Sequence, residues 1–518
     1  MRQLLGAMSH CASQGKVGMT NVLEWLEARV REMPDKVAFA DEHDEVTFRK
    51  LAQRAQAAGS FIAANAESRA PIPCYMEKST RAIAAMLGAV YAGCCYSVID
   101  VRQPAPRART VVDKLEAPLV VADAATIGAA REIFVAYRVV SIEDIIDGEV
   151  DSTLLARRRA DAIDIDPLYI NFTSGSTGTP KGVAVCHRSV IDFIGSFTSI
   201  FGITQDDVLA NQAPFDFDVS VKDVYGGLAT GATVQMIPRE FFSVPVNLMD
   251  FLIEREVTVC TWAVSAMCFV SMMGGFDYRV PTTIREVIFS GEPIPPKQLA
   301  IWRAALPDAT FVNVYGPTEV TCNCTYHVIE RVYAKDEVIP MGKPFPNERV
   351  FLLDDEGHLV DQPGVEGEIC VVGTCLALGY YNDPEKTAGA FVQNPLSPAF
   401  PETMYRTGDV AVLDEEGRFV YRGRKDHQIK HLGQRIELGE IDAAAHATDG
   451  VERACTVYEP RKKRILMFYV GACERDALAA TLKDVLPQYM VPNKIRQLDT
   501  MPLTKNGKID RQALLELK

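Results

Sequence analysis

A short Ser-, Gly- and Thr-rich segment between two apolar runs restricts the fold of this chain most. Leu168–Phe172 leads into the segment and Val183–Cys186 follows it, which predicts strand, loop, strand. Glycines let backbone N–H groups approach an oxyanion, hydroxyls add donors, and Lys181 adds positive charge. The spacing does not fit the Walker GxxxxGK[ST] motif. Taken alone, the segment is as well explained by a flexible surface loop as by a phosphate-binding loop.

Size and charge narrow the possible functions. The 518 residues allow roughly three domain-sized units. The formal net charge of −14 opposes nonspecific binding to nucleic acid, which needs a large basic surface. Any polyanionic ligand must therefore be held by local positive groups.

The sequence predicts neither membrane insertion nor secretion. No apolar run approaches the roughly 20 residues that span a bilayer, and Met1–Thr20 lacks the apolar core of a signal peptide. The 13 cysteines are scattered and have no CxxC spacing. We therefore expect a cytoplasmic protein with reduced thiols, rather than a disulfide framework or a zinc site.

Helical patterns and short apolar runs alternate through the first two thirds of the chain, which predicts an α/β domain with mostly parallel sheets. The expected helices are 21–31, 49–64, 83–92 and 189–201. The expected strands are 34–40, 96–100, 119–122, 138–141, 257–261, 286–289 and 311–314.

From about residue 345 the pattern changes to short strands and turns. Expected strands at 350–354, 367–373, 410–414 and 418–421 indicate a smaller β-rich subdomain. A compact tail with strand, helix and hairpin signals follows Asp426. Near its end, Asn506-Gly507 is a strong turn signal, so Lys508 should project from a surface loop.

Polar groups follow several of the expected strands. Ser290–Pro293 and Tyr315–Glu319 come directly after apolar runs, and ligands in open α/β sheets bind beyond such carboxyl ends. Glu319 there suits Mg²⁺ beside phosphates. Asp218 stands among aromatic and apolar residues, where a carboxylate needs a cationic partner such as an α-ammonium group. The alternative is that Asp218 caps the helix that follows.

Together these segments resemble the adenylate-forming superfamily of acyl- and aminoacyl-activating enzymes. The resemblance is strongest to the adenylation domains of nonribosomal peptide synthetases and to D-alanine–carrier-protein ligases. Six motifs occur in the family's order, from Asn21 to the C-terminus. The resemblance implies a large N-terminal α/β domain (21–425, β-rich subdomain about 345–425) and a small, mobile α+β C-terminal lid (427–518). It also implies a hinge near Asp426, with residues 1–20 as an N-terminal extension.

The resemblance implies how ATP would be bound. The loop from Thr173 to Lys181 would cover the β- and γ-phosphates, Asn313 and Tyr315 would contact adenine, and Asp409 would accept hydrogen bonds from the ribose hydroxyls. The implied nucleotide-binding residues are Thr173, Ser174, Gly175, Ser176, Thr177, Gly178, Thr179, Lys181, Gly291, Glu292, Asn313, Val314, Tyr315, Gly316, Pro317, Thr318, Asp409, Tyr421, Arg424 and Lys508.

The implied catalytic residues are Lys508, Lys181, Thr318 and Glu319, with Glu319 as the Mg²⁺ ligand. When a carboxylate attacks the α-phosphate of ATP, two anions must come together. Lys508 and Mg²⁺ would offset that repulsion, most strongly as charge moves onto the leaving pyrophosphate.

The resemblance also implies a pocket for an amino acid, because amino-acid-activating members carry an aspartate at the position of Asp218 to pair with the substrate ammonium. The implied substrate-binding residues are Asp218, Val219, Lys222, Thr261, Ile288, Ser290, Val314, Cys322, Asn323 and Lys508. Lys222 and Ser290 depart from the D-alanine ligases. Lys222 could reach an acidic or hydroxylated substrate side chain, or it could turn away and pair with Asp223 or Glu292.

Two further segments of the C-terminal lid are predicted to serve the second half-reaction. After rotation about the hinge, Gln428–Glu440 would face the tunnel of an acceptor thiol. The basic run Arg461–Arg464 is either a solvated hairpin turn or a docking patch for an acidic carrier protein.

The sequence therefore predicts a free-standing amino-acid adenylating enzyme. It would use ATP and Mg²⁺ to form an aminoacyl-AMP and would pass the acyl group to the phosphopantetheine thiol of a carrier protein. One alternative is an acid–CoA ligase of the same superfamily. A second is a nucleotide-binding regulator without turnover, against which the presence of Lys508, Glu319 and Asp409 argues.

Overall fold

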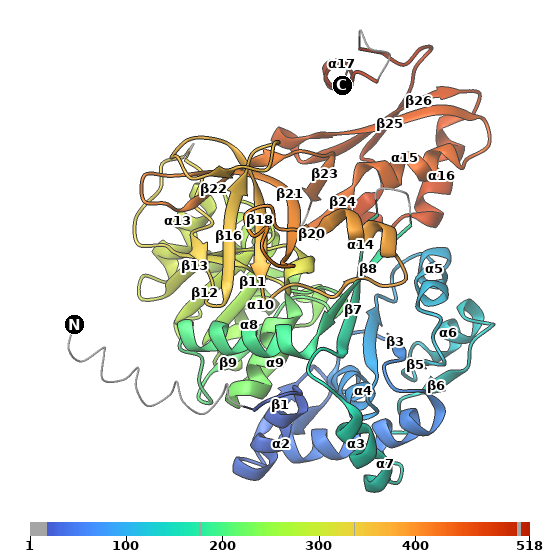
Figure 1. Cartoon of the computed structure of the whole chain (residues 1–518), viewed down its shortest axis with the longest axis vertical. Helices are drawn as coiled ribbons and strands as arrows, with labels where there is room; N and C mark the ends of the chain where they lie inside the picture. The colour runs from blue at the N-terminus through green and yellow to red at the C-terminus, as the bar shows by residue number, and fades with distance from the viewer. Residues whose placement is uncertain (1–17, 176–178, 336, 432, 505–508, 518) are drawn as a thin grey trace.

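Two large, mostly parallel sheets with helices between and outside them form the N-terminal part of the protein, and a smaller domain lies over one end (Figure 1). The computed structural model describes residues 18–175, 179–335, 337–431, 433–504 and 509–517. Within these ranges, no helix combines the length and the apolar character needed to cross a bilayer. Ser176, Thr177, Gly178 and Lys508 lie outside the described residues.

The first large sheet contains nine described strands in the order β15-β14-β13-β12-β11-β9-β10-β1-β2. Its central strands are parallel, and the edge pairs β1–β2, β13–β14 and β14–β15 are antiparallel. The strands are β1 (Val37–Ala40), β2 (Glu45–Thr47), β9 (Val208–Asn211), β10 (Thr233–Met236), β11 (Val259–Ala263), β12 (Glu286–Ser290), β13 (Thr310–Tyr315), β14 (Thr325–Val328) and β15 (Lys343–Pro344).

The second large sheet contains seven described strands in the order β19-β8-β7-β4-β3-β5-β6. It is parallel from β6 to β7, whereas β7–β8 and β8–β19 are antiparallel. The strands are β3 (Pro71–Tyr75), β4 (Cys95–Ile99), β5 (Val120–Ala122), β6 (Val139–Ser141), β7 (Pro167–Thr173), β8 (Lys181–Cys186) and β19 (Gly379–Tyr380).

Alternating side chains along the strands bury both faces of each sheet. On β12, for example, Ile288 packs into the central core between the sheets and Phe289 into the core on the outer face. The central helices are α2 (Leu23–Glu32), α3 (Phe48–Asn65), α4 (Thr80–Tyr91), α8 (His187–Ile200) and α9 (Ser220–Thr230). The outer faces are covered by α5 (Ala105–Leu115) and α6 (Ile127–Ile133) on one side, and by α10 (Pro245–Glu254), α11 (Val264–Met272), α12 (Gly275–Tyr278) and α13 (Pro296–Ala305) on the other.

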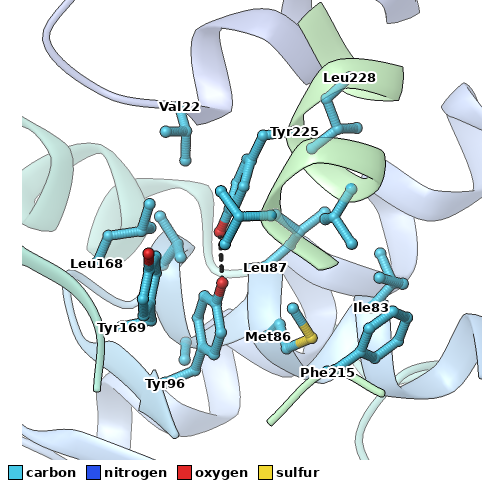
Figure 2. Close-up of a cluster of buried hydrophobic side chains, with 14 of the residues drawn as sticks. Val22, Ile83, Met86, Leu87, Tyr96, Leu168, Tyr169, Phe215, Tyr225 and Leu228 are labelled. Atoms are coloured by element: carbon cyan, nitrogen blue, oxygen red, sulfur yellow. Dashed lines mark hydrogen bonds between the residues drawn. The ribbon is translucent and has the colours of Figure 1, made fainter. Parts of the chain in front are cut away.

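Helix α9 is fixed in the central core by its apolar face. Tyr225 and Leu228 point toward α4 and the strands of the second sheet, and the hydroxyls of Tyr225 and Tyr96 lie 2.9 Å apart in a hydrogen bond (Figure 2). Tyr169 on β7 belongs to the same cluster. A buried hydroxyl pair of this kind fixes the orientation of the helix. Helix α9 carries the predicted substrate-binding residue Lys222, and Asp218 and Val219 directly precede it.

A third sheet and a C-terminal α+β domain complete the fold. The third sheet has the order β17-β16-β18-β21-β20, with β22 on β21. Its elements are β16 (Glu348–Leu353), β17 (Leu359–Val360), β18 (Gly367–Gly373), α14 (Pro384–Ala390), β20 (Phe391–Gln393), β21 (Thr403–Leu413) and β22 (Phe419–Arg424). The C-terminal elements are β23 (Gln428–His431), β24 (Gln434–Glu437), α15 (Leu438–His446), β25 (Val451–Glu459), β26 (Arg464–Gly471), α16 (Arg475–Val485), β27 (Lys494–Gln497) and α17 (Arg511–Glu516).

The predicted fold class is confirmed: α/β with mostly parallel sheets, a β-rich part and a small α+β C-terminal part. Most predicted elements lie within a few residues of their observed bounds. Helix α7 (Ser152–Asp161), which lies just before β7, was not predicted. Short 3-10 turns connect other elements: η1 (Arg239–Ser243), η2 (Thr318–Val320), η3 (Pro460–Lys462) and η4 (Gln488–Met490).

Candidate active site

The Ser/Gly/Thr-rich loop connects β7 and β8, as predicted. The two strands are antiparallel, and the cross-strand partners Thr173 and Lys181 stand at the loop's base. A Cβ on Gly175 would lie 2.0 Å from the Thr179 carbonyl oxygen, so only glycine fits this close approach of the backbone. The Gly175 N–H donates to the Glu440 carboxylate at 3.2 Å. The described part of the loop therefore holds an anionic group from the C-terminal domain.

Glu319 is the most enclosed carboxylate of the site. Its side chain is 0% exposed and accepts hydrogen bonds from Arg435 at 2.7 Å and from the Tyr380 hydroxyl at 2.8 Å. The Lys181 Nζ lies 3.5 Å away. Burial alone would raise the pKa of Glu319, but Arg435 and Lys181 hold that pKa well below its usual range. Glu319 is therefore an anion surrounded by cations.

The residues predicted to bind adenine surround one small cavity of about 40 Å³ at the carboxyl ends of β12 and β13. The predicted residues that line it are Gly291, Glu292, Asn313, Val314, Tyr315, Gly316 and Tyr421. A Cβ on Gly316 would lie 2.5 Å from the Asn323 Cα, so this glycine lets the two chain segments pack directly. Ile339, Met341 and Lys430 also line the cavity and were missed, because the sequence gives no local signal for them.

Asp409 and Asp426, the predicted ribose ligand and hinge residue, are connected by Arg424. The Arg424 guanidinium lies 2.7 Å from a carboxylate oxygen of each aspartate. The Tyr315 hydroxyl donates to the other oxygen of Asp409 at 2.5 Å. Hydrogen bonds thus join Tyr315, Asp409, Arg424 and Asp426 in one chain.

Asp218 does not cap helix α9. The residue before the helix is Val219, and no side chain caps the helix N-terminus. Instead, the Thr318 hydroxyl donates to the Asp218 carboxylate at 2.5 Å. Burial raises the pKa of Asp218, although the Thr318 hydrogen bond and the nearby Lys222 act in the opposite direction. The helix-cap alternative is therefore wrong, and the carboxylate faces the predicted nucleotide residues.

The predicted amino-acid pocket is a buried cluster on α9, β11, β12, β13 and the segment after η2. Each of its described residues is at most 8% exposed: Asp218, Val219, Lys222, Thr261, Ile288, Ser290, Val314, Cys322 and Asn323. Thr321 and Cys322 have positive φ angles of 54° and 84°. Non-glycine residues adopt this region rarely, and such strain clusters at functional sites.

The hairpin β23–β24 of the C-terminal domain inserts between the β7–β8 loop and the adenine-side cavity. Lys430 and Arg435 are register partners and project from the same face. The Lys430 ammonium lies 5.2 Å from the centre of the Tyr315 ring, whereas Arg435 binds Glu319. The prediction located the segment 428–440 but missed these two side chains. Gly433 between two short segments that alternate polar and apolar residues was the available sequence signal.

Further contacts fix the hairpin on the N-terminal domain. The Ser174 hydroxyl donates to the Arg435 carbonyl oxygen at 2.8 Å and accepts from the Glu437 N–H at 3.1 Å. Arg107 on α5 forms a buried ion pair with Glu440. These interdomain contacts involve charged groups that are almost fully buried, so they form one defined arrangement of the domains.

The segment that carries Lys508 lies outside the described residues. Its described neighbours Leu503 and Ile509 form an isolated antiparallel bridge, and α17 packs on β25. Figure 1 shows α17 at the outer end of the C-terminal domain, far from β7 and β8. In this arrangement the β7–β8 loop is faced by the hairpin β23–β24 and not by the described residues next to Lys508.

Three residues of the basic turn 461–464 form ion pairs, although their side chains remain 38–58% exposed. Lys463 lies 3.0 Å from the Glu292 carboxylate, which lines the adenine-side cavity. Arg464 and Lys462 pair with Glu459 on their own hairpin at 2.8 and 3.5 Å. The ion pair between Lys463 and Glu292 therefore connects the C-terminal domain to the wall of the adenine-side cavity.

A larger cavity of about 560 Å³ lies at the junction of the two domains. The N-terminal domain contributes Asp100, Asp216 and Ser265 to its wall, and the C-terminal domain contributes Gln434 and Tyr489. Because Gln434 belongs to β24, the cavity reaches the same hairpin that carries Arg435.

These observations define a two-domain enzyme with a ligand site at the domain junction, and comparison with known proteins gives its family. The AMP-binding enzyme model matches residues 26–381, and the model of the AMP-binding enzyme C-terminal domain matches residues 440–508. The chain therefore belongs to the AMP-binding enzyme family.

Three relatives illustrate the range of similar proteins. A D-alanine–D-alanyl carrier protein ligase from Lacticaseibacillus casei is 30% identical, over 96% of this chain and 98% of its own length. Bacitracin synthase 1 from Bacillus licheniformis is 32% identical over 95% of this chain, which spans only 9% of that protein. A solved NRPS protein with adenylation and PCP domains superposes with a TM-score of 0.83 at 25% identity, covering 96% of this chain and 84% of that one.

Proposed function

We propose that this protein activates an amino acid as its aminoacyl-AMP, using ATP and Mg²⁺, and transfers the acyl group to the phosphopantetheine thiol of a carrier protein. The observation that carries the proposal is Asp218. Its carboxylate is buried next to Thr318 and forms no ion pair with any described residue, so it is suited to receive a substrate ammonium. Relatives that are carrier protein ligases over nearly their whole length support the same reaction.

Glu319 could hold a divalent cation once Arg435 withdraws with the C-terminal domain. In the arrangement described here the Arg435 guanidinium and the Lys181 ammonium neutralise this buried carboxylate, so the ion would take the place of Arg435. Mg²⁺ usually takes only one or two protein carboxylates, and substrate phosphates supply further ligands. Glu319 would hold the ion, which would neutralise charge on the phosphates of ATP.

The side chains of this protein would perform the remaining work. Lys181 and the backbone N–H groups of the β7–β8 loop would bind the terminal phosphates. The hydrogen bond from the Gly175 N–H to the Glu440 carboxylate supports this role, because it places an acceptor oxygen at the loop. Asp218 would orient the amino acid through its ammonium group. Lys508 would bridge the substrate carboxylate and the α-phosphate after the C-terminal domain turns about Asp426.

We infer that the arrangement described here serves the transfer step. The β23–β24 hairpin closes the site beside Glu319, and the junction cavity of about 560 Å³ reaches this hairpin from the surface. A thiol on a flexible arm could enter by that route. Every described cysteine is a free, buried thiol, which supports operation in the reducing cytoplasm.

The pH dependence of substrate binding tests the role of Asp218. Its pKa is raised by burial, so the ionised form that binds an ammonium is lost at a higher pH than for an ordinary carboxyl. Below that pKa, the KM for the amino acid should rise about tenfold per pH unit, whereas the KM for ATP changes little. Pyrophosphate exchange measured over a pH series checks this. An amino-acid KM that is flat down to the ordinary aspartate range would contradict the assignment.

Charge reversal at Lys463 tests whether the basic turn serves transfer. We expect Lys463→Glu to raise the KM for the holo-carrier roughly two- to fivefold, because a partly exposed ion pair contributes about 0.5–1 kcal/mol. Amino-acid-dependent exchange should be unchanged. Lys462→Glu is the matched control, because Lys462 contacts only its own hairpin in the described structure. An equal increase in the carrier KM for the two variants would indicate that the turn attracts an acidic carrier without a specific contact. A loss of amino-acid-dependent exchange in Lys463→Glu would count against a role limited to transfer.

The choice of acceptor separates the proposal from an acid–CoA ligase. The proposed enzyme should load a holo-carrier protein and leave free CoA largely unused. Release of an acyl-CoA from an acid without an α-amine, with no loading of any carrier, would favour the ligase.

A further inference from the structure

Three of the predicted substrate-binding residues, on β11 and β12, face helix α9, as the register of the first sheet shows. Thr261 donates a hydrogen bond to Asp223 on α9, so this side chain faces the helix. Ile288 is the register partner of Thr261, and Ser290 is the partner of Ala263 two positions further along. Because paired residues in a sheet project to the same face, Ile288 and Ser290 also face α9.

Lys222 is a fully buried ammonium with few partners in this pocket. The residue is 0% exposed, and its Nζ donates to the Asn323 amide oxygen at 3.2 Å. Among the described residues it forms no ion pair. A buried ammonium has three donors and is costly without an anionic or acceptor partner. The sequence offered Asp223 or Glu292 as the partner of Lys222. Both alternatives are wrong, because the Lys222 ammonium contacts Asn323 instead.

Those two carboxylates are engaged elsewhere. Asp223 accepts from Thr261 and from the Asn211 amide at 2.9 Å, and Asn211 in turn binds the Lys78 ammonium through its carbonyl oxygen at 3.0 Å. Glu292 pairs with Lys463. Asp218 and Asp223 act on Lys222 only at longer range than an ion pair. The positive charge of Lys222 therefore remains available to a ligand.

A second donor in the pocket also lacks a partner. The Ser290 side chain is 4% exposed, and its Oγ forms no hydrogen bond with the described residues. Buried hydroxyls are normally hydrogen-bonded, so an unpaired one in a pocket marks a position for a ligand acceptor. Lys222 requires an acceptor, preferably one with negative charge, and the Ser290 hydroxyl can donate a hydrogen bond to such a group.

We propose that the amino acid activated by this protein is dicarboxylic, with its side-chain carboxylate bound by the Lys222 ammonium and the Ser290 hydroxyl. This inference rests on the proposed function. Asp218 and Lys222 then complement the two charges by which a dicarboxylic amino acid differs from a simple carboxylic acid. The α-ammonium binds Asp218, the side-chain carboxylate binds Lys222, and the α-carboxylate is left for the attack on ATP.

The direct test is pyrophosphate exchange with matched pairs of amino acids. Aspartate is compared with asparagine, and glutamate with glutamine, each in both chiral forms, with alanine as a small apolar reference. Because the amides have the same shape and lack the charge, we expect kcat/KM for the preferred acid to exceed that of its amide at least about 100-fold. Alanine should be as poor a substrate as the amides.

A Lys222→Met variant tests whether the lysine causes the preference. Methionine keeps an unbranched side chain and removes a buried charge, so the fold should survive, and a thermal melt checks this. The preference for acid over amide should fall by at least about tenfold. Lys78→Met, which removes the half-buried ammonium that binds the Asn211 carbonyl oxygen, is the control and should keep the preference.

The outcomes separate this inference from the proposed function. Exchange with alanine or an amide above that with the dicarboxylic acids would overturn the inference and leave amino-acid activation standing. A preference for the acid that persists in Lys222→Met would also overturn it. If none of these five amino acids supports exchange, the inference fails, whereas the proposed function fails only if no member of a full panel of D- and L-amino acids supports exchange.

Discussion

Asp218→Asn should abolish most amino-acid-dependent pyrophosphate exchange. The substitution preserves the shape of the side chain and the acceptor for the Thr318 hydroxyl, which lies 2.5 Å away, but it removes the negative charge. A substrate ammonium would then be buried without a counter-charge, which costs about 2–5 kcal/mol, or roughly 30- to 5,000-fold in kcat/KM. ATP binding should change little, because Asp218 would contact the amino acid and not the nucleotide.

The matched control for this variant is Asp216→Asn, two residues earlier on the same segment. Asp216 lines the junction cavity rather than the amino-acid pocket, so its removal should leave exchange far less affected. Exchange by Asp218→Asn at the wild-type level would show that the activated acid has no α-amine, which is the prediction of the acid–CoA ligase alternative.

Lys508→Ala should leave the fold intact and remove most adenylation. Lys508 is proposed to offset the repulsion between the substrate carboxylate and the α-phosphate, a contribution that commonly amounts to about 100- to 1,000-fold in rate. Helix α17, which begins at Arg511 shortly after this lysine in the sequence, lies at the outer end of the C-terminal domain, remote from β7 and β8 (Figure 1). Pyrophosphate exchange measures the loss directly.

The transfer step should respond differently to the same substitution. When supplied with preformed aminoacyl-AMP, Lys508→Ala should still load a holo-carrier protein, because β23–β24 faces the site in the arrangement described here. Lys505→Ala, in the same segment, is the control and should retain exchange. If exchange in Lys508→Ala stays near the wild-type level, the role assigned to this lysine is incorrect.

The fold was largely predictable because its elements have strong local signals. Alternating helices and apolar runs gave the parallel sheets, and the Ser/Gly/Thr-rich segment was correctly placed between two strands. The predicted adenine-side residues lie around one cavity because Gly291, Asn313 and Tyr315 all follow or end neighbouring parallel strands. Position at a strand's carboxyl end is a property that the sequence reveals.

The remaining features depend on contacts between distant segments, for which one sequence carries no signal. Arg435 and Lys430 reach Glu319 and Tyr315 only because the C-terminal domain packs in a particular orientation. Locally, Asp218 has the pattern of a helix cap, and its actual partner Thr318 is 100 residues away. Lys222 likewise finds its partner, Asn323, across the pocket, whereas the sequence offered its neighbour Asp223.

The central claim is that an amino acid, held by its ammonium on Asp218, is activated on ATP. ATP–pyrophosphate exchange with purified wild-type protein across D- and L-amino acids, with their deaminated analogues alongside, tests this claim most directly. The account predicts Mg²⁺-dependent exchange with at least one amino acid and essentially none with the analogue that lacks its α-amine. Equal exchange with both members of that pair, or exchange with neither, would contradict it.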